Sequence, residues 1–355
     1  MVGILPGEGI GPEVIAATLA VLDALQAAQL VRLERRVGGP IGLGAGVVGD
    51  GAVTQEVVEF CRQTFEDGGA VLCGPGGGRF VYDLRAQFDL YCKIVPLRPM
   101  AALHRVSPLK EKALKDVDIL VVRDNAGGIY QGRWGVRDDP AEGRTAEHHF
   151  SYTEAQVERI VRAGARLAQS RRGRMDVIVN DGGIPSSSDL WRATAERIAA
   201  EMGVACAFRN VDFAAYALIQ HPQQFDVLVS PNLIGDILAD LGAVFLGSRG
   251  LSFSGNFSAC GRAVYQTGHG AAKDLAGTDR ANPVGQILSM AMMLRESYRL
   301  DDAADIVERA VESIFRSGYR TDDLAEPGCH CIGTRQMGEL IAAEILSLAS
   351  TMVPA

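Results

Sequence analysis

The sequence predicts an α/β protein in which strands and helices alternate along the chain. Short runs of Val, Ile and Leu are separated by longer segments whose apolar residues recur with helical spacing. The length points the same way, because 355 residues exceed what one ordinary hydrophobic core organises. We therefore expect two α/β domains that share a cleft.

The first predicted strand is Val2–Leu5, followed by a glycine-rich loop and a helix over residues 12–26. Pro12 fits this assignment, since the first turn of a helix tolerates proline. Further strands are predicted at Ala70–Cys73 and at residues 119–123, 177–179 and 226–229. Helices are predicted between them at Glu154–Gln169 and at residues 188–202.

Residues 133–149 break this alternation, because they are rich in Gly, Arg, Asp and His and have hardly any apolar period. We interpret the segment, at about 133–150, as an arm that leaves the body and meets a second subunit. The chain shows no short repeat and no low-complexity linker. The two domains are therefore expected to be interleaved in sequence.

Composition restricts the class of partner. Hydrophobic residues make up 47% and charged residues 22%, which is typical of a folded protein, and the net charge is −8. Acidity of this size argues against nucleic acid and anionic membranes and favours a small-molecule substrate. No apolar run approaches the roughly 20 residues of a membrane span, and residues 1–6 do not read as a signal peptide, so we expect a cytoplasmic protein.

The seven cysteines are an odd number without framework spacing, so most are expected to be buried thiols. Cys329, His330 and Cys331 offer metal-binding atoms close together. Because no second ligand pair accompanies them, we favour a surface turn.

The sharpest candidate site is a pair of carboxylates. Asp236 and Asp240 are four residues apart, which places both on one face of a helix, and Asp212 precedes them. Such like charges repel unless a cation lies between them, and Mg²⁺ or Mn²⁺ is the natural oxygen-bound candidate. A solvated helix face is the alternative, which we disfavour because the neighbouring residues are apolar: Ile234, Ile237, Leu238 and Leu241.

The glycines are a weaker signal. Gly7, Gly9 and Gly11 lack the full dinucleotide fingerprint, so a Rossmann fold is not supported and a turn explains them almost as well. In residues 269–277, His269 offers a ring to stack on adenine and Asp274 a carboxylate for ribose hydroxyls. A structural loop fits those residues equally well.

Taken together, these segments resemble the β-decarboxylating dehydrogenases, the isopropylmalate and isocitrate dehydrogenase family. Nearly the whole chain takes part, with motifs in the family's order at residues 9–13, 107–110, 123–132, 232–240, 269–277, 291–295, 318–322 and 333–334. The resemblance implies two interleaved α/β domains of the isopropylmalate dehydrogenase type with a dimer arm. Residues 1–99 plus 251–355 would bind nucleotide, and residues 100–250 would bind substrate and metal and form a homodimer.

The resemblance also implies a chemistry. Asp212 from the partner subunit, Asp236 and Asp240 match the ligands of a divalent ion, which chelates the 2-hydroxyl and adjacent carboxylate of a malate-type substrate. Hydride passes from C2 to NAD and the 3-carboxylate leaves as CO₂. Tyr130 matches the tyrosine that assists protonation.

Arg123 and Arg105 match two of the family's three substrate-binding arginines. Val95 stands where the third belongs. Arg98 lies close by in the sequence and Lys93 adds a charge that the family pattern lacks, so both are substrate-binding candidates.

The largest departure is at the family's catalytic lysine, where this chain has Asp181. Gly183 replaces a neighbouring asparagine and Gln266 a glutamate. Counting charges predicts a more negative pocket, hence a substrate with one anionic group fewer or with a cationic group facing Asp181. Asp181 either acts as the base for the 2-hydroxyl or is protonated beside the other carboxylates.

Asp274 matches the residue that accepts from the ribose hydroxyls in NAD-using members, and it would repel the 2′-phosphate of NADP. By the same resemblance four further residues contact the cofactor: His269, Gly270, Asn282 and Gly11. Two functions follow as candidates: NAD-dependent oxidation of an altered 2-hydroxy acid, or a catalytically silent nucleotide-binding subunit or sensor. The sequence names neither the substrate nor the loss of CO₂.

Overall fold

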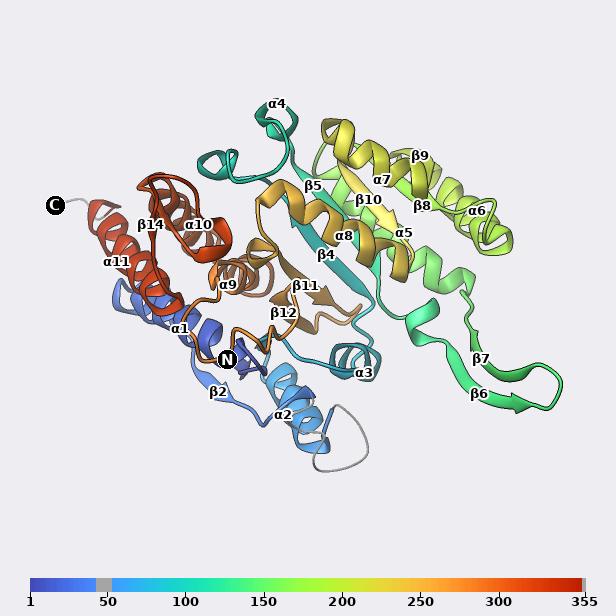
Figure 1. The fold of residues 1–355 in the computed structure, drawn as a ribbon, viewed down its shortest axis with the longest axis horizontal. Helices are drawn as coiled ribbons and strands as arrows, with labels where there is room; N and C mark the ends of the chain where they lie inside the picture. Colours follow the sequence, from blue (N-terminus) through green and yellow to red (C-terminus); the bar gives the residue numbers. More distant parts are fainter. Residues whose placement is uncertain (43–52, 353–355) are drawn as a thin grey trace.

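The computed structural model describes residues 1–42 and 53–352, and its central feature is a ten-stranded mixed sheet (Figure 1). In spatial order the strands are β2 (Arg35–Val37), β1 (Val2–Leu5), β3 (Ala70–Cys73), β12 (Ala263–Thr267), β11 (Phe253–Phe257), β4 (Cys92–Leu97), β5 (Ile119–Asp124), β10 (Val227–Ser230), β8 (Arg174–Val179) and β9 (Ala205–Asn210). β11 and β4 run antiparallel to their neighbours, and the remaining pairs are parallel. The predicted α/β fold class is therefore confirmed.

The two halves of the sheet come from different parts of the chain. The half from β2 to β4 uses residues 2–97 and 253–267, and the half from β5 to β9 uses residues 119–230. The chain thus builds part of the first half, all of the second, and then returns, as interleaved domains require. The antiparallel pair β4 and β5 makes the sheet continuous between them. The domain boundaries at 99/100 and 250/251 stay a prediction.

Helices cover both faces of this sheet. On the first half they are α1 (Gly11–Ala27), α2 (Gln55–Glu66), α3 (Phe80–Gln87) and α9 (Val284–Tyr298), with α10 (Asp301–Arg316) and α11 (Thr334–Met352) packed on α9 and α1. On the second half they are α4 (Glu111–Leu114), α5 (Glu154–Gln169), α6 (Pro185–Met202), α7 (Val211–Gln220) and α8 (Asn232–Leu246). Among the described residues, no helix is long and apolar enough to cross a membrane.

Strand alternation separates the two cores of the second half. Val122 on β5 packs with α5 and α6 on one face, whereas its neighbour Val121 packs with α7 and α8 on the other. Gly164 lets α5 approach the sheet, because a Cβ there would lie 2.3 Å from Val229 Cγ2. The positions of α7 and α8 matter for function, since they carry the candidate metal ligands.

Five strands of the central sheet were not predicted: β2, β4, β9, β11 and β12. β4 contains Lys93 and Pro96, and β11 and β12 are short strands with buried polar residues such as Asn256 and Gln266. Their partners lie far away in sequence, so local periodicity carries little information about them. The predicted ranges Val2–Leu5, Ala70–Cys73 and Glu154–Gln169 agree with the structure at both ends.

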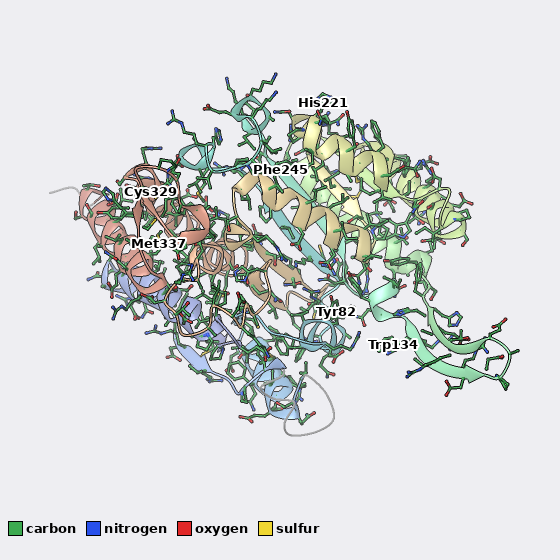
Figure 2. All side chains as sticks on the ribbon, viewed as in Figure 1. Tyr82, Trp134, His221, Phe245, Cys329 and Met337 are labelled. Atoms are coloured by element: carbon green, nitrogen blue, oxygen red, sulfur yellow. The ribbon has the colours of Figure 1, made fainter. Side chains whose placement is uncertain are left out.

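The segment predicted as an arm forms an antiparallel hairpin of β6 (Arg133–Asp139) and β7 (Gly143–His149) that projects from the body (Figure 1). Trp134 and Val136 on it are more than half exposed. At its root Trp134 lies close to α3 (Figure 2), where the Arg79 guanidinium carbon is 4.5 Å from the Trp134 ring centroid and 5.4 Å from that of Tyr82.

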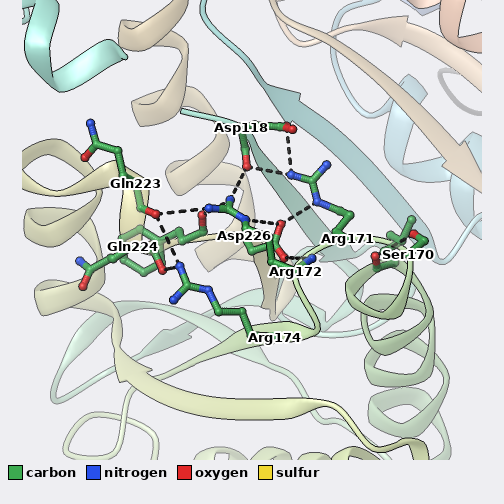
Figure 3. Close-up of polar contacts among 10 residues, drawn as sticks. Asp118, Ser170, Arg171, Arg172, Arg174, Gln223, Gln224 and Asp226 are labelled. Atoms are coloured by element: carbon green, nitrogen blue, oxygen red, sulfur yellow. Dashed lines mark hydrogen bonds and ion pairs between the residues drawn. The ribbon is translucent and has the colours of Figure 1, made fainter. Parts of the chain in front are cut away.

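A buried ion-pair network holds the sheet at the amino end of β10 (Figure 3). Asp226 is fully buried, accepts hydrogen bonds from Arg171 Nε at 2.7 Å and Arg172 N at 3.0 Å, and forms an ion pair with Arg172 Nε at 3.3 Å. Arg171 also pairs with the half-exposed Asp118 at 3.0 Å. The network ties the turn after α5 to the starts of β5 and β10, at the edge opposite the candidate site.

Candidate functional site

The site residues gather where β5 and β10 end at their carboxyl edge. Arg123 is the penultimate residue of β5, and α8 begins at Asn232, directly after β10 and Pro231. Lys93 on β4 is the register partner of Arg123. The parallel strands and the helix that follows thus bring basic side chains to the start of α8.

Arg123 is at the centre of this cluster. The residue is 1% exposed, and its guanidinium donates to Asn232 Oδ1 through Nε at 3.1 Å and Nη2 at 2.7 Å and pairs with Asp236 Oδ1. Tyr130 donates its hydroxyl to Asp236 Oδ2 at 3.0 Å. Gly235 permits the approach, because a Cβ there would lie 3.0 Å from Arg123 Cβ and 2.2 Å from Ser230 Oγ.

These contacts set the protonation of the cluster. Burial opposes ionisation of Asp236, but the positive charges of Arg123 and Lys93 outweigh it and lower the pKa of that carboxyl. Burial and the Asp236 charge raise the pKa of Tyr130, so its phenol keeps its proton. The site therefore presents an ionised carboxylate and a phenol able to donate.

Asp236 and Asp240 fit a hard divalent ion. They lie one turn apart on α8 with side chains 37% and 48% exposed, and Asp240 pairs with Arg249 at 2.7 Å. Within the described ranges of one chain, no three Asp, Glu, His or Cys side chains gather as a metal site. Asp212, near the start of α7, does not join the pair within the chain. Its role as a ligand from a second copy stays a prediction.

Arg85 on α3 was missed by the sequence analysis. It is 5% exposed, and the charges of Arg123 and Asp236 both act on it. Burial, then the charge of Arg123, lowers its pKa to about 9. Among the described residues it makes no hydrogen bond or ion pair, and its Nε is buried without a partner. The only indication of this in the sequence is that Arg85 directly follows an apolar residue, Leu84, which is buried on the same short helix.

The structure does not bring Arg98 or Arg105 to this cluster. Arg98 follows β4 at the opposite edge, five residues and therefore about 16 Å along the strand from Lys93. Arg105 is exposed and lines a separate hollow together with His104, Glu111 and Cys329. A substrate bound beside Arg123 would thus meet Arg85 and Lys93 first.

Asp181 follows β8 and is held by an arginine of its own chain. Arg192 on α6 donates to it through Nε at 3.0 Å and Nη2 at 2.6 Å, and Asn210 Nδ2 adds a contact at 3.3 Å. The Arg192 hydrogen bonds lower the pKa of Asp181. The alternative of a protonated Asp181 is therefore wrong for this conformation, because a bidentate guanidinium favours the charged form.

The glycine loop and the 269–279 segment form one unit. Gly9 has φ +61°, and a Cβ there would lie 1.9 Å from Ala271 O, whose oxygen accepts from Ile10 N at 2.9 Å. Glu13 accepts from Gly277 N, and also from Asp279 N at 3.1 Å. Gly11 is packed against Pro6 O, where a Cβ would be 2.5 Å away. Candidate cofactor-binding residues that are far apart in the sequence thus lie close together in the structure.

This unit can hold a nucleotide. Burial lowers the pKa of His269, whose Nδ1 lies 3.0 Å from Gly270 O and whose Nε2 is buried without a partner in the described residues. Gly270 faces open space and Asp274 is exposed. Asn282 is buried and donates to Asp323 at 3.1 Å. A flat neutral ring with an unsatisfied nitrogen beside an open glycine suits an adenine.

Cys329 and Cys331 lie at the surface, at and next to the short strand pair β13 (Tyr319–Arg320) and β14 (His330–Cys331), with their sulfurs 3.5 Å apart. His330 packs against the Tyr319 ring at 5.4 Å. The described residues provide no third ligand there.

Asp124, next to Arg123 in the sequence, should make the stability of the fold depend on pH. Burial raises the pKa of Asp124 to about 6, although Gly127 N donates to it at 2.8 Å. The folded protein then binds an extra proton between about pH 4, the unfolded pKa, and about pH 6. Its contribution to the unfolding free energy should fall by at most about 3 kcal/mol as pH rises through that window.

Urea unfolding of the wild type and Asp124→Asn at pH 4.5, 6 and 7.5 measures this effect. The unfolding free energy of the variant should lack this dependence on pH. The stability of the variant relative to the wild type should therefore increase as pH rises. Parallel stability profiles for the two proteins would contradict the assignment.

Comparison with known proteins agrees with this geometry. The profile of the isocitrate/isopropylmalate dehydrogenase family matches residues 1–341. The 3-isopropylmalate dehydrogenase of Syntrophotalea carbinolica is 39% identical, with 97% of this chain and 97% of that protein covered. That of Carboxydothermus hydrogenoformans is 37% identical, with 97% and 94% covered. The crystal structure of isocitrate dehydrogenase from Methylococcus capsulatus gives a TM-score of 0.87 at 29% identity, covering 97% of this chain and 99% of that one.

The resemblance carried by separate motifs thus extends over nearly the whole chain and its fold. The chain belongs to the isocitrate/isopropylmalate dehydrogenase family of decarboxylating oxidoreductases.

Proposed function

We propose that the protein catalyses the NAD-dependent, metal-assisted oxidation and decarboxylation of a 2-hydroxy acid related to 3-substituted malate, with altered charge. The observation that carries this is the cluster of Arg123, Asp236 and Tyr130 at the carboxyl edge of the sheet. Beside it, Lys93 and Arg85 are buried basic side chains, and Arg85 Nε has no hydrogen-bond partner among the described residues. Such a site calls for an anionic ligand.

Asp236 and Asp240 would hold Mg²⁺ or Mn²⁺, with Asp212 of a second copy completing the ligands. Bound there, the ion would supply Lewis acidity to the oxygens of the substrate. Arg123 pairs with Asp236 and keeps it ionised, which suits a hard cation.

The protein's own groups divide the remaining work. Arg123 and Arg85 would bind carboxylate oxygens, and Tyr130, whose phenol keeps its proton, would donate to the carbon that loses CO₂. Asp181 is ionised and 40% exposed, so it is the candidate base for the 2-hydroxyl once released from Arg192.

NAD would bind at the unit formed by residues 6–11 and 269–279. His269 and Gly270 would bind the adenine, and Asn282 and Gly11 would form part of the nucleotide-binding site. Asp274 is an exposed carboxylate, which accepts from ribose hydroxyls and repels a 2′-phosphate. NAD is therefore proposed over NADP.

A homodimer is proposed because large apolar side chains are exposed around Asp212. Phe213 and Tyr216 on α7 are 53% and 61% exposed, and Ile237 on α8 is 57% exposed. Trp134 on the arm is 54% exposed. A second copy covering these helices would bury the patch and bring its own Asp212 close to α8.

One observation favours the alternative of a catalytically silent nucleotide-binding subunit or sensor. At the position of the family's lysine this chain has Asp181, whose negative charge is already paired with Arg192. A protein that only binds nucleotide would tolerate that pair.

The deciding experiment incubates the purified protein with NAD or NADP, Mn²⁺ and a panel of 2-hydroxy acids, and follows absorbance of the reduced nicotinamide. Oxidation of at least one compound with NAD, abolished by chelation of the metal, is expected. NAD binding without turnover of any malate derivative would favour the silent subunit.

A further inference from the structure

Lys93 is a buried basic side chain in an unusual position. As the register partner of Arg123 on the antiparallel strand β4, it projects on the same face of the sheet, with Cβ atoms about 5 Å apart. It is 7% exposed. Within residues 1–42 and 53–352 it forms no hydrogen bond or ion pair, although a buried ammonium normally has a partner.

Every charged group that faces Lys93 is either basic or already engaged. Arg85 and Arg123 repel it, and Asp236 is held by Arg123 and Tyr130. Asp240 pairs with Arg249. Burial, followed by the charges of Arg85 and Arg123, holds the pKa of Lys93 well below its ordinary value.

The neutral neighbour on β11 is engaged as well. Asn256, the register partner of Lys93 on that side, donates to Val264 O at 3.0 Å and accepts from Asn125 Nδ2 at 3.0 Å. Neither Asn256 nor the carboxylates on α8 therefore bind Lys93, and on α3 the Nε of Arg85 is buried without a partner among the described residues. Lys93 and Arg85 act on one another electrostatically, and two such basic groups can together bind an anion.

Val95, two residues along β4, shows how this anion-binding site differs from the family pattern. Val95, where the resemblance places an arginine, projects on the same face as Lys93 and packs in an apolar cluster with Leu97 and Val121. Lys93 lies two residues away, about 7 Å along the strand and nearer the carboxyl edge of β5. The positive charge has thus moved by one strand repeat.

We propose that Lys93 determines substrate specificity by binding a second carboxylate of the substrate, together with Arg85. The preferred ligand is then a 2-hydroxy dicarboxylate of the malate type, and a 2-hydroxy acid with one carboxylate is disfavoured. This inference rests on the proposed function. It places the altered charge of the substrate in the substituent on C3 rather than in either carboxylate.

The assignment agrees with decarboxylation. In the proposed reaction NAD⁺ would accept the C2 hydrogen as hydride and Asp181, the candidate base, would take the hydroxyl proton, leaving a ketone at C2. The bond from C3 to its carboxylate then breaks, CO₂ leaves, and the electron pair passes to the C2 oxygen as an enolate before C3 takes a proton. This step requires a carboxylate on C3, the group that Lys93 is proposed to select.

The test compares malate with 2-hydroxybutyrate, which carries a methyl group in place of the second carboxylate. Calorimetric titration with Mg²⁺ present measures binding of each enantiomer to wild type, Lys93→Met and Lys93→Arg, with the exposed Lys115→Met as the matched control. The wild type should bind one malate enantiomer at least about 10-fold more tightly than the matching 2-hydroxybutyrate. Lys93→Met should lose this preference, and Lys93→Arg should keep part of it.

Thermal unfolding without ligand checks that the variants fold. Lys93→Met should be at least as stable as the wild type, because it replaces a buried amine that has no partner with an apolar side chain of similar length. An unchanged malate preference in a folded Lys93→Met, or no preference in the wild type, overturns the proposal. Oxidation of a 2-hydroxy acid that is indifferent to Lys93 leaves the proposed function standing. A Lys93-dependent malate preference without any turnover refutes that function alone.

Discussion

Asp236→Asn should abolish turnover, lowering kcat by at least about 10³-fold with whichever 2-hydroxy acid the protein oxidises. The substitution removes one of only two carboxylates that α8 offers to the metal, and it leaves Arg123 without its ion pair. Initial rates at saturating NAD and Mn²⁺ measure the loss.

The matched control is Asp302→Asn, at the exposed start of α10, which should keep wild-type kinetics. Mn²⁺ binding followed by electron paramagnetic resonance separates the causes, since Asp236→Asn should also weaken the metal. Turnover by Asp236→Asn at the wild-type rate would show that a metal bound by Asp236 takes no part in the reaction.

Asp226→Ala should lower the free energy of unfolding by about 3–5 kcal/mol. Asp226 is fully buried, accepts hydrogen bonds from Arg171 Nε and Arg172 N, and forms an ion pair with the Arg172 side chain (Figure 3). Its loss leaves two partly buried guanidinium groups without their shared partner at the start of β10. Urea unfolding at neutral pH followed by circular dichroism measures the change.

Asp118→Ala is the control, because Asp118 pairs with the same Arg171 at 3.0 Å but is 52% exposed. We expect it to cost less than about 1 kcal/mol. Equal effects of the two substitutions would show that burial is not what makes the Asp226 network stabilising.

Helical and apolar periodicity predicted the elements that are locally consistent. Glu154–Gln169 has its capping box at Thr153 and Gln156 and a continuous apolar face, so neighbouring residues contain the whole signal. β4 is the opposite case. Lys93 and Pro96 weaken its strand pattern, and the strand exists because β5 and β11 pair with it from residues 119–124 and 255–257.

The same distinction applies to the site. The spacing of Asp236 and Asp240 needs only one helix, so the sequence alone indicated the pair. Lys93 was already a candidate in the sequence, whereas Arg85 became one only through its burial and its Nε without a partner in the described residues. Arg105 matched a motif in sequence, but the chain places it in a separate hollow.

The sequence by itself determined the fold class, the arm and the carboxylate pair, because these depend on residue order and local spacing. Tertiary structure decided which basic groups face those carboxylates, since strands far apart in sequence set that geometry. It also decided the state of Asp181, which the bidentate Arg192 keeps ionised. Charge counted along a sequence omits such partners, whereas the electrostatic energy of a buried group depends on the groups within a few ångströms of it.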